Sequence, residues 1–68
     1  MARFRFSMIG TAQVPLLEVA ARDLTELLES VDRSRFLEAQ MVEIDGCGVS
    51  CGVIVATRRI QMISEEVF

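Results

Sequence analysis

Residues 36–55 read FLEAQMVEIDGCGVSCGVIV, and the Asp45-Gly46 pair near the centre of this stretch decides how the chain folds back. Asp-Gly between two runs rich in apolar residues is the strongest short hairpin signal, because glycine readily adopts the positive φ of a tight primed turn. The stretch therefore predicts two antiparallel strands joined at this turn, with Ile44 opposite Cys47.

The only two cysteines, Cys47 and Cys51, lie in the second of these strands. The Asp-Gly register puts them on one face, with Cys51 opposite Gln40, and separates their Cα atoms by roughly 13 Å of extended chain. A disulfide needs Cα atoms within about 7 Å, so this register predicts two free, buried thiols. A wider loop with residues 48–50 at its tip would place the cysteines opposite each other and allow the bond, and the sequence leaves this alternative open.

A metal site at these thiols needs more ligands than one chain offers. A closed zinc site takes four ligands, whereas the chain has two cysteines and no histidine. A thiol or inter-subunit metal site at Cys47 and Cys51 therefore requires two chains to share four thiolates. Because C-x-x-x-C in a strand is not a zinc-knuckle spacing, we expect small residues packed in a tight hairpin, with no metal and no cofactor.

Upstream of the hairpin, the spacing of the apolar residues changes from every second residue to the spacing of a helix. Residues 3–9 (RFRFSMI) alternate between polar and apolar, which predicts a half-buried strand with Phe4, Phe6 and Met8 facing the core. Pro15 then stands where the first turn of a helix tolerates proline. The apolar residues that follow recur at helical spacing and predict one buried stripe, formed by Leu16, Leu17, Ala20, Leu24, Leu27, Leu28 and Val31.

The predicted element order is β-α-β-β in a single small α+β domain, residues 1–68. A strand-helix-strand crossover is parallel and right-handed, and the return strand of the hairpin fills the gap between the first two strands. The result is a three-stranded sheet in the order 1-3-2 with one helix on one face. The last strand runs from Cys47 through Ile63, with a bend or bulge at Thr57-Arg58.

Such a sheet has nothing in its own chain to cover its second face. In the Asp-Gly register an apolar patch lies there, and a chain of 68 residues is small enough to need a partner for stability. We expect a homodimer or higher oligomer that buries this open face, with another protein as a further candidate partner. The residues expected to carry the interface are Phe36, Val42, Val49, Val53 and Val55.

The composition argues against an enzyme. The chain has no histidine, lysine or tyrosine, so the commonest general base and the Schiff-base amine are both missing.

No apolar run approaches the roughly 20 residues of a membrane-spanning helix, and the amino-terminal residues lack the apolar middle region of a signal peptide. We therefore expect a cytoplasmic protein with reduced thiols and no membrane partner.

All seven basic residues are arginines. In the 1-3-2 order, Arg3, Arg5 and Arg59 lie together on the face away from the helix, where they form a candidate phosphate-binding cluster. The net charge of −3 and the lack of exposed aromatic residues on that face weigh against nucleic acid, and pairing with glutamates is the simpler explanation. The sequence favours a non-enzymatic oligomeric interaction or regulatory module, with nucleic-acid binding at this cluster and a Cys47/Cys51 site as alternatives.

Overall fold

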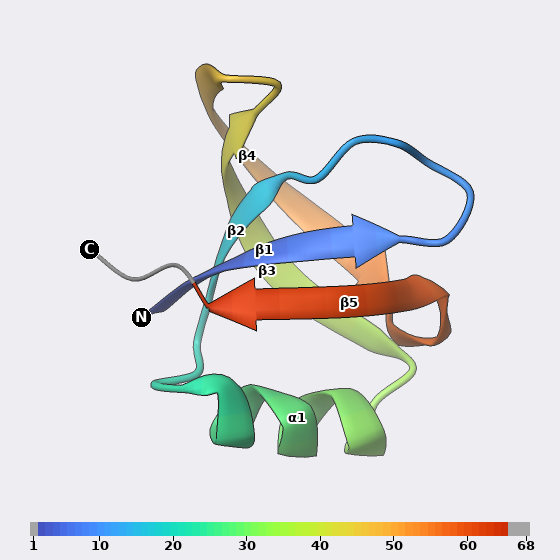
Figure 1. Cartoon of the computed structure of the whole chain (residues 1–68). Coiled ribbons are helices and arrows are strands. Elements are labelled where there is room, and N and C mark those ends of the chain that lie inside the picture. Colours follow the sequence, from blue (N-terminus) through green and yellow to red (C-terminus); the bar gives the residue numbers. More distant parts are fainter. Residues whose placement is uncertain (1, 66–68) are drawn as a thin grey trace.

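The computed structural model describes residues 2–65, which form one curled sheet and one α-helix (Figure 1). One helix and one sheet agree with the expected α+β class, but the sheet differs from the predicted one. Along the chain the elements are β1 (Ala2–Met8), β2 (Leu16–Val19), α1 (Leu24–Arg33), β3 (Phe36–Ile44), β4 (Cys47–Ala56), the 3-10 helix η1 (Thr57–Arg59) and β5 (Ile60–Glu65).

The strand order is β4-β3-β2-β1-β5, and every neighbouring pair is antiparallel. The predicted three-stranded sheet in the order 1-3-2 is therefore wrong. The predicted sheet omits two strands, β2 and β5. β2 pairs with both β1 and β3 and occupies the position assigned to the return strand of the hairpin, while β5 pairs with the other side of β1.

β2 lies where the sequence predicts the first turns of a helix. Leu16, Leu17 and Val19 are all buried, and so short an apolar run fits a strand as well as the start of a helical stripe. Antiparallel pairing with β1, from Ala2 opposite Val19 to Arg5 opposite Leu16, provides partners for the backbone of this segment. The tertiary pairing decides between the two conformations, and the prediction of a helix from Pro15 is wrong.

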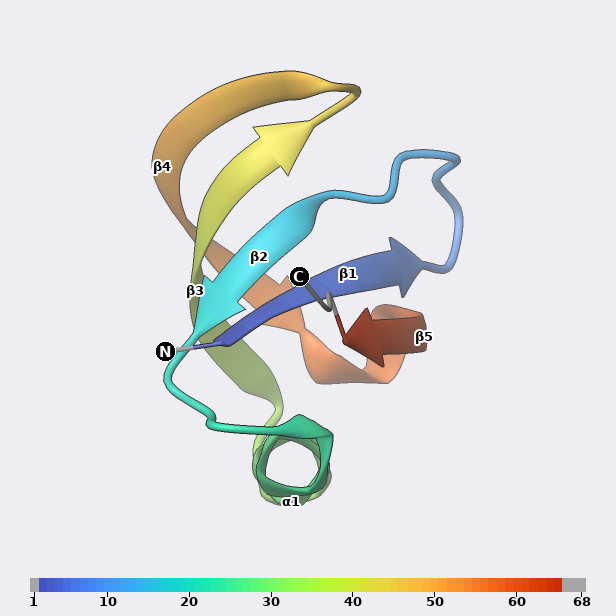
Figure 2. The ribbon, with the colours of Figure 1, turned by 60° about the vertical axis from the view of Figure 1, so that its left-hand side comes forward.

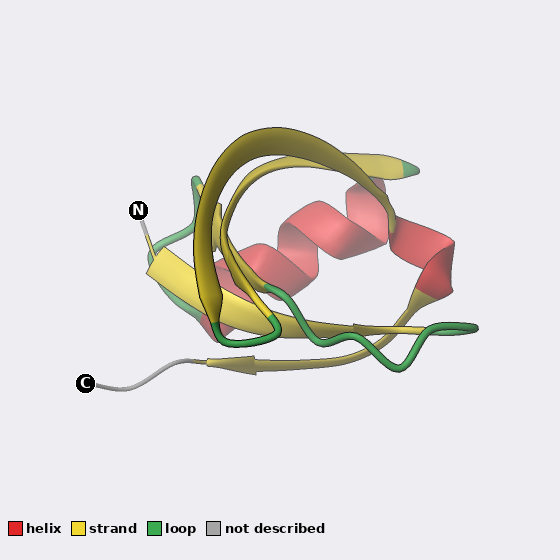
Figure 3. Ribbon diagram, turned by 90° about the horizontal axis from the view of Figure 1, so that it is seen from above, coloured by secondary structure: helices red, strands yellow, loops and turns green. Residues whose placement is uncertain are grey.

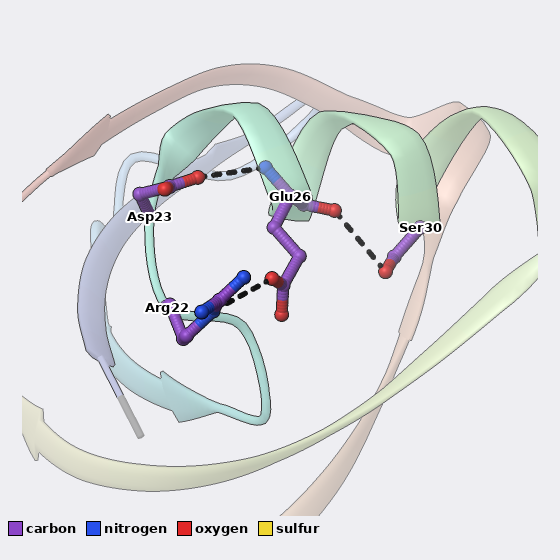
Figure 4. A network of polar contacts seen from close by, with 4 residues as sticks. All are labelled: Arg22, Asp23, Glu26 and Ser30. Atoms are coloured by element: carbon purple, nitrogen blue, oxygen red, sulfur yellow. Dashed lines mark hydrogen bonds and ion pairs between the residues drawn. The ribbon is translucent and has the colours of Figure 1, made fainter.

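The helix begins at Leu24 because Asp23 caps it. The Asp23 carboxylate accepts a hydrogen bond from the backbone N–H of Glu26 at 2.9 Å, and the Arg22 guanidinium lies 3.2 Å from the Glu26 carboxylate (Figure 4). One turn later, the Ser30 hydroxyl donates to the Glu26 carbonyl at 3.4 Å. Aspartate followed three residues later by glutamate is a recognised helix-start signal, which the prediction of a longer helix overlooks.

Leu27 is the one buried side chain of α1, and Val31 packs against the same core. Leu27 is fully buried, whereas Leu24 is exposed and Leu28 is 65% exposed. Figures 1 and 2 show the helix below β1 and β5, where it covers the lower side of the curled sheet. No helix within residues 2–65 has the length and apolar character needed to cross a membrane.

The turn at Asp45-Gly46 is confirmed. Both residues have positive φ, 52° for Asp45 and 79° for Gly46, as a type I′ turn requires. Ile44 pairs with Cys47, as the sequence predicts. The strongest local signal in the chain therefore fixes the hairpin correctly.

The hairpin register shifts a few residues beyond the turn. Glu43 pairs with Gly48, but Met41 pairs with Cys51, so β4 uses three residues where β3 uses two. An extra residue of this kind is a β-bulge. The predicted pairing of Gln40 with Cys51 is therefore wrong by one residue. The pairs predicted farther from the turn are wrong by the same one-residue shift.

β4 and β5 are consecutive in the chain but lie at opposite edges of the sheet. Only the three residues of η1 join them, and this break confirms the bend predicted at Thr57-Arg58. The sheet curls so that the end of β4 approaches the start of β5, and Figures 2 and 3 show β3 and β4 bending over together.

The curl encloses the hydrophobic core. Phe4 and Phe6 of β1 are fully buried, and Met8 packs against the core, as the alternation of the first strand predicts. The other buried members of the cluster come from β2, α1, β4 and the segment that follows β2, and they are Leu17, Val19, Ala21, Leu27 and Val55.

The attachment of α1 is tested by two neighbouring leucines. Leu27→Ala should lower the free energy of unfolding by about 2–5 kcal/mol, because it leaves a cavity in a packed core. Leu28→Ala should change it by less than about 0.5 kcal/mol, since this side chain is mostly exposed. Urea unfolding followed by circular dichroism measures both, and equal losses in the two variants would show that the helix docks through a different face.

The turn is tested by two glycines of the hairpin. Gly46→Ala should destabilise the fold by about 1–2 kcal/mol, because an L-residue is disfavoured at positive φ. Gly48→Ala has open space around the new Cβ and no positive φ, so it should be neutral or stabilise by up to about 1 kcal/mol. Thermal unfolding compares them, and an equal cost at both sites would place the turn elsewhere.

Candidate functional site

The five residues predicted to form an interface do not share one surface. Phe36 is 64% exposed and Val49 is also exposed, whereas Val42 and Val53 are half-buried. Val55 is 8% exposed and belongs to the core, and Val53 packs against it. The curl turns this end of β4 toward the interior. The open apolar face expected of a three-stranded sheet is therefore not found within residues 2–65.

β4 instead presents a free edge. It pairs with β3 on one side and with no strand of the described chain on the other. Its ten residues, CGVSCGVIVA, include no charged residue and no proline, which are the residues that commonly block pairing at exposed edges. Ile54 adds an apolar side chain that is 70% exposed. We call the unpaired side of Cys47–Ala56, with the exposed side chains of Val49 and Ile54, the β4 edge.

The two cysteines lie on this strand. Cys47 and Cys51 are free thiols, and both are exposed in the single chain, whereas the sequence predicts free thiols that are buried. Between residues 2 and 65, no group of three or more cysteine, aspartate or glutamate side chains is placed to hold a metal ion. The thiols are thus surface groups of β4.

The structure separates the three arginines predicted to bind phosphate together. Arg3 Nε lies 3.1 Å from Glu18 Oε2, and Arg5 Nη2 lies 2.7 Å from Glu43 Oε1. These pairs link β1 to β2 and β3, and partly exposed pairs of this kind contribute up to about 1 kcal/mol each. Arg59 lies in η1 instead, so the predicted cluster does not form.

Arg59 belongs to a different group of arginines. Arg35, Arg58 and Arg59 line a hollow of ≈ 400 Å³ together with Phe36 and Ala56, where β3 begins and β4 ends. We call these five residues the arginine corner. No ion pair within residues 2–65 involves its three guanidinium groups. Three positively charged groups therefore lie beside the exposed ring of Phe36.

Hydrogen bonds to the backbone hold this corner together. The Thr57 N–H donates to the Arg35 carbonyl at 2.9 Å, and the Thr57 hydroxyl donates to the Ser34 carbonyl at 2.6 Å. On the other side of η1, the Ile9 N–H donates to the Arg59 carbonyl at 2.7 Å. These bonds tie the start of β3, η1 and the end of β1 to one another.

Of this corner, sequence reasoning singles out Arg59 as a phosphate-binding candidate and Phe36 as an interface residue, although the sequence contains a signal for the rest. Pairing of Phe36 with Ala56 brings the residue before β3 close to the residues after β4. Arg35 stands just before β3, and Arg58 follows the bend at Thr57. The hairpin register together with that bend is therefore sufficient to bring these arginines together.

A second hollow, ≈ 320 Å³, lies between α1 and β5 and is lined mainly by apolar side chains. Its most exposed members are Leu28 and Met62, which is 63% exposed. β5 is the other edge of the sheet and pairs only with β1 among the described strands. Within residues 2–65 the sheet thus has two free edges, one uncharged over ten residues and one beside an apolar groove.

Comparisons with protein-family models, with curated proteins and with solved structures find no match to this chain. The function is therefore inferred from the β4 edge and the arginine corner.

Proposed function

We propose that this protein is a non-enzymatic interaction module that assembles with copies of itself through the β4 edge. The observation that carries the proposal is the edge itself, ten uncharged residues with unpaired backbone groups on one side. A second β4 strand, added antiparallel, supplies partners for those groups. The lack of histidine and lysine supports a binding role over a catalytic one.

Antiparallel pairing between identical strands follows two-fold symmetry, so residue i of one copy meets residue j of the other and j meets i, and only a residue on the axis meets its own counterpart. From Cys51 to Ala56, β4 pairs with β3 without interruption, whereas the bulge near Val49 disturbs the ladder toward the hairpin tip. The regular part is therefore the better template. An axis near its middle brings the two Ile54 side chains together, and a cross-strand pair of this kind contributes about 0.2–1 kcal/mol.

The size of the chain supports the same arrangement. A domain of 68 residues buries a smaller fraction of its surface than a larger one, and oligomerisation is a common way to add stability. Edge pairing would extend the sheet across two chains without disturbing the core around Phe4 and Leu27. The assembly surface thus differs from the flat sheet face expected from the sequence.

Ile54→Lys tests this proposal, because it places a charge on the β4 edge at an exposed position. Light scattering of the unmodified protein at micromolar concentration should give twice the chain mass of 7.6 kDa. The variant should be monomeric, with association weakened by at least about tenfold, since a lysine on an edge strand opposes pairing.

Met62→Lys is the matched control. Met62 is exposed to a similar extent and lies on β5, the other edge, so this variant should keep the dimer mass. Circular dichroism should show the same fold in all three proteins. A monomeric unmodified protein, or a dimer lost in Met62→Lys but kept in Ile54→Lys, would contradict assembly through the β4 edge.

A further inference from the structure

We propose that the arginine corner binds a nucleotide, with the phosphate held by the guanidinium groups and the base stacked on Phe36. This site adjoins the carboxyl end of the β4 edge, with which it shares Ala56, whereas its arginines and Phe36 lie outside that edge. The proposal does not depend on self-assembly. It also differs from the cluster predicted from the sequence, because Arg3 and Arg5 take no part in it.

The cationic half of the site comes from three side chains. Arg35, Arg58 and Arg59 line the same hollow, and a guanidinium group presents a planar set of donors that matches phosphate oxygens. Among residues 2–65 none of these three arginines is in an ion pair. An incoming phosphate therefore displaces no carboxylate in order to bind.

The aromatic half comes from Phe36. Its ring is 64% exposed and lines the same hollow as the arginines. Single-stranded nucleic acids and nucleotides are bound by this combination of an exposed aromatic ring, which stacks on a base, and cationic groups, which track the phosphate. A phosphate alone would need only the arginines, so the ring points to a ligand with a flat aromatic group.

The site is held in place before any ligand arrives. Thr57 bonds to Ser34 and Arg35 through its hydroxyl and its N–H, and Ile9 bonds to the Arg59 carbonyl. The backbone beneath the arginines is thus fixed from both sides of η1, and less ordering is needed on binding. The hollow, at ≈ 400 Å³, has the size of a small-molecule site.

The acidic net charge of the chain does not prevent this binding, because no acidic residue of the described chain lines the corner. Four of the seven arginines lie in residues 33–35 and 58–59. The acidic residues nearest to them in sequence, Asp32 and Glu38, form no ion pair with the arginines of the corner within residues 2–65. At 0.1 M salt, interactions between exposed charges fade beyond about 10 Å. In its own lining the corner has three guanidinium groups and no carboxylate.

Free nucleotides and single-stranded nucleic acids carry the same chemistry, and the test distinguishes them. Binding to a fluorescein-labelled oligouridylate is measured by anisotropy at low salt, and binding to uridine monophosphate and to inorganic phosphate by calorimetry. Arg58→Gln should weaken nucleotide binding by about tenfold and make the salt slope of oligouridylate binding less steep by about 0.7. Phe36→Leu should weaken nucleotide binding and leave phosphate binding unchanged.

Arg22→Gln is the charge-matched control, because Arg22 is exposed and its partner is Glu26, away from the corner. It should bind like the unmodified protein. Saturable binding of the monophosphate identifies a free nucleotide, and binding of the oligouridylate alone identifies a single strand; either supports the proposal. No saturable binding to either, an equal loss in Arg22→Gln and Arg58→Gln, or no effect of Phe36→Leu on nucleotide binding overturns it.

Discussion

The short link between β4 and β5 is the constraint on which the rest of the structure depends. The two strands lie at opposite edges of a five-stranded sheet, and in a flat sheet those edges would be about 19 Å apart. The three residues of η1 span about 14 Å at most between the flanking Cα atoms. A flat sheet is therefore excluded. The sheet curls, one of its faces becomes the interior, and Val55 of β4 meets Phe4 and Phe6 of β1 in one core.

The same constraint produces both candidate surfaces. Because the sheet curls without pairing β4 to β5, no strand within residues 2–65 covers the second edge of Cys47–Ala56. Because η1 turns tightly against the start of β3, Arg58 and Arg59 come to lie beside Arg35. The arginine corner sits at the carboxyl end of β4. In a two-fold dimer through the β4 edge, the two corners would lie at opposite ends of the shared strand pair, so assembly and ligand binding are compatible.

Local features of this fold are predictable from the sequence, whereas its topology is not. Asp45-Gly46 and the alternation around Phe4 and Phe6 each specify one local conformation, and the structure agrees with both. The four residues Leu16–Val19 do not, because an apolar run of that length fits a strand or a helix turn. If these residues are taken as helix, the connection from the first strand to the hairpin becomes a parallel crossover. The resulting 1-3-2 sheet, which the structure does not contain, places Arg3, Arg5 and Arg59 together. The β4 bulge does carry a signal, because glycine inside a strand often marks a bulge and Gly48 borders this one. The register prediction does not use that signal, and the register error follows.

The strand order is the central claim, and nuclear Overhauser effects between backbone protons of neighbouring strands test it most directly. The account predicts cross-strand contacts between Phe6 and Ile63 and between Leu17 and Met41 in the same sample. The first pair places β5 beside β1, and the second places β2 beside β3. A ladder of backbone-to-backbone contacts between β1 and residues 47–56, as the order 1-3-2 requires, would contradict the curled sheet and with it both proposed surfaces; side-chain contacts of Val55 with Phe4 and Phe6 in the core would not.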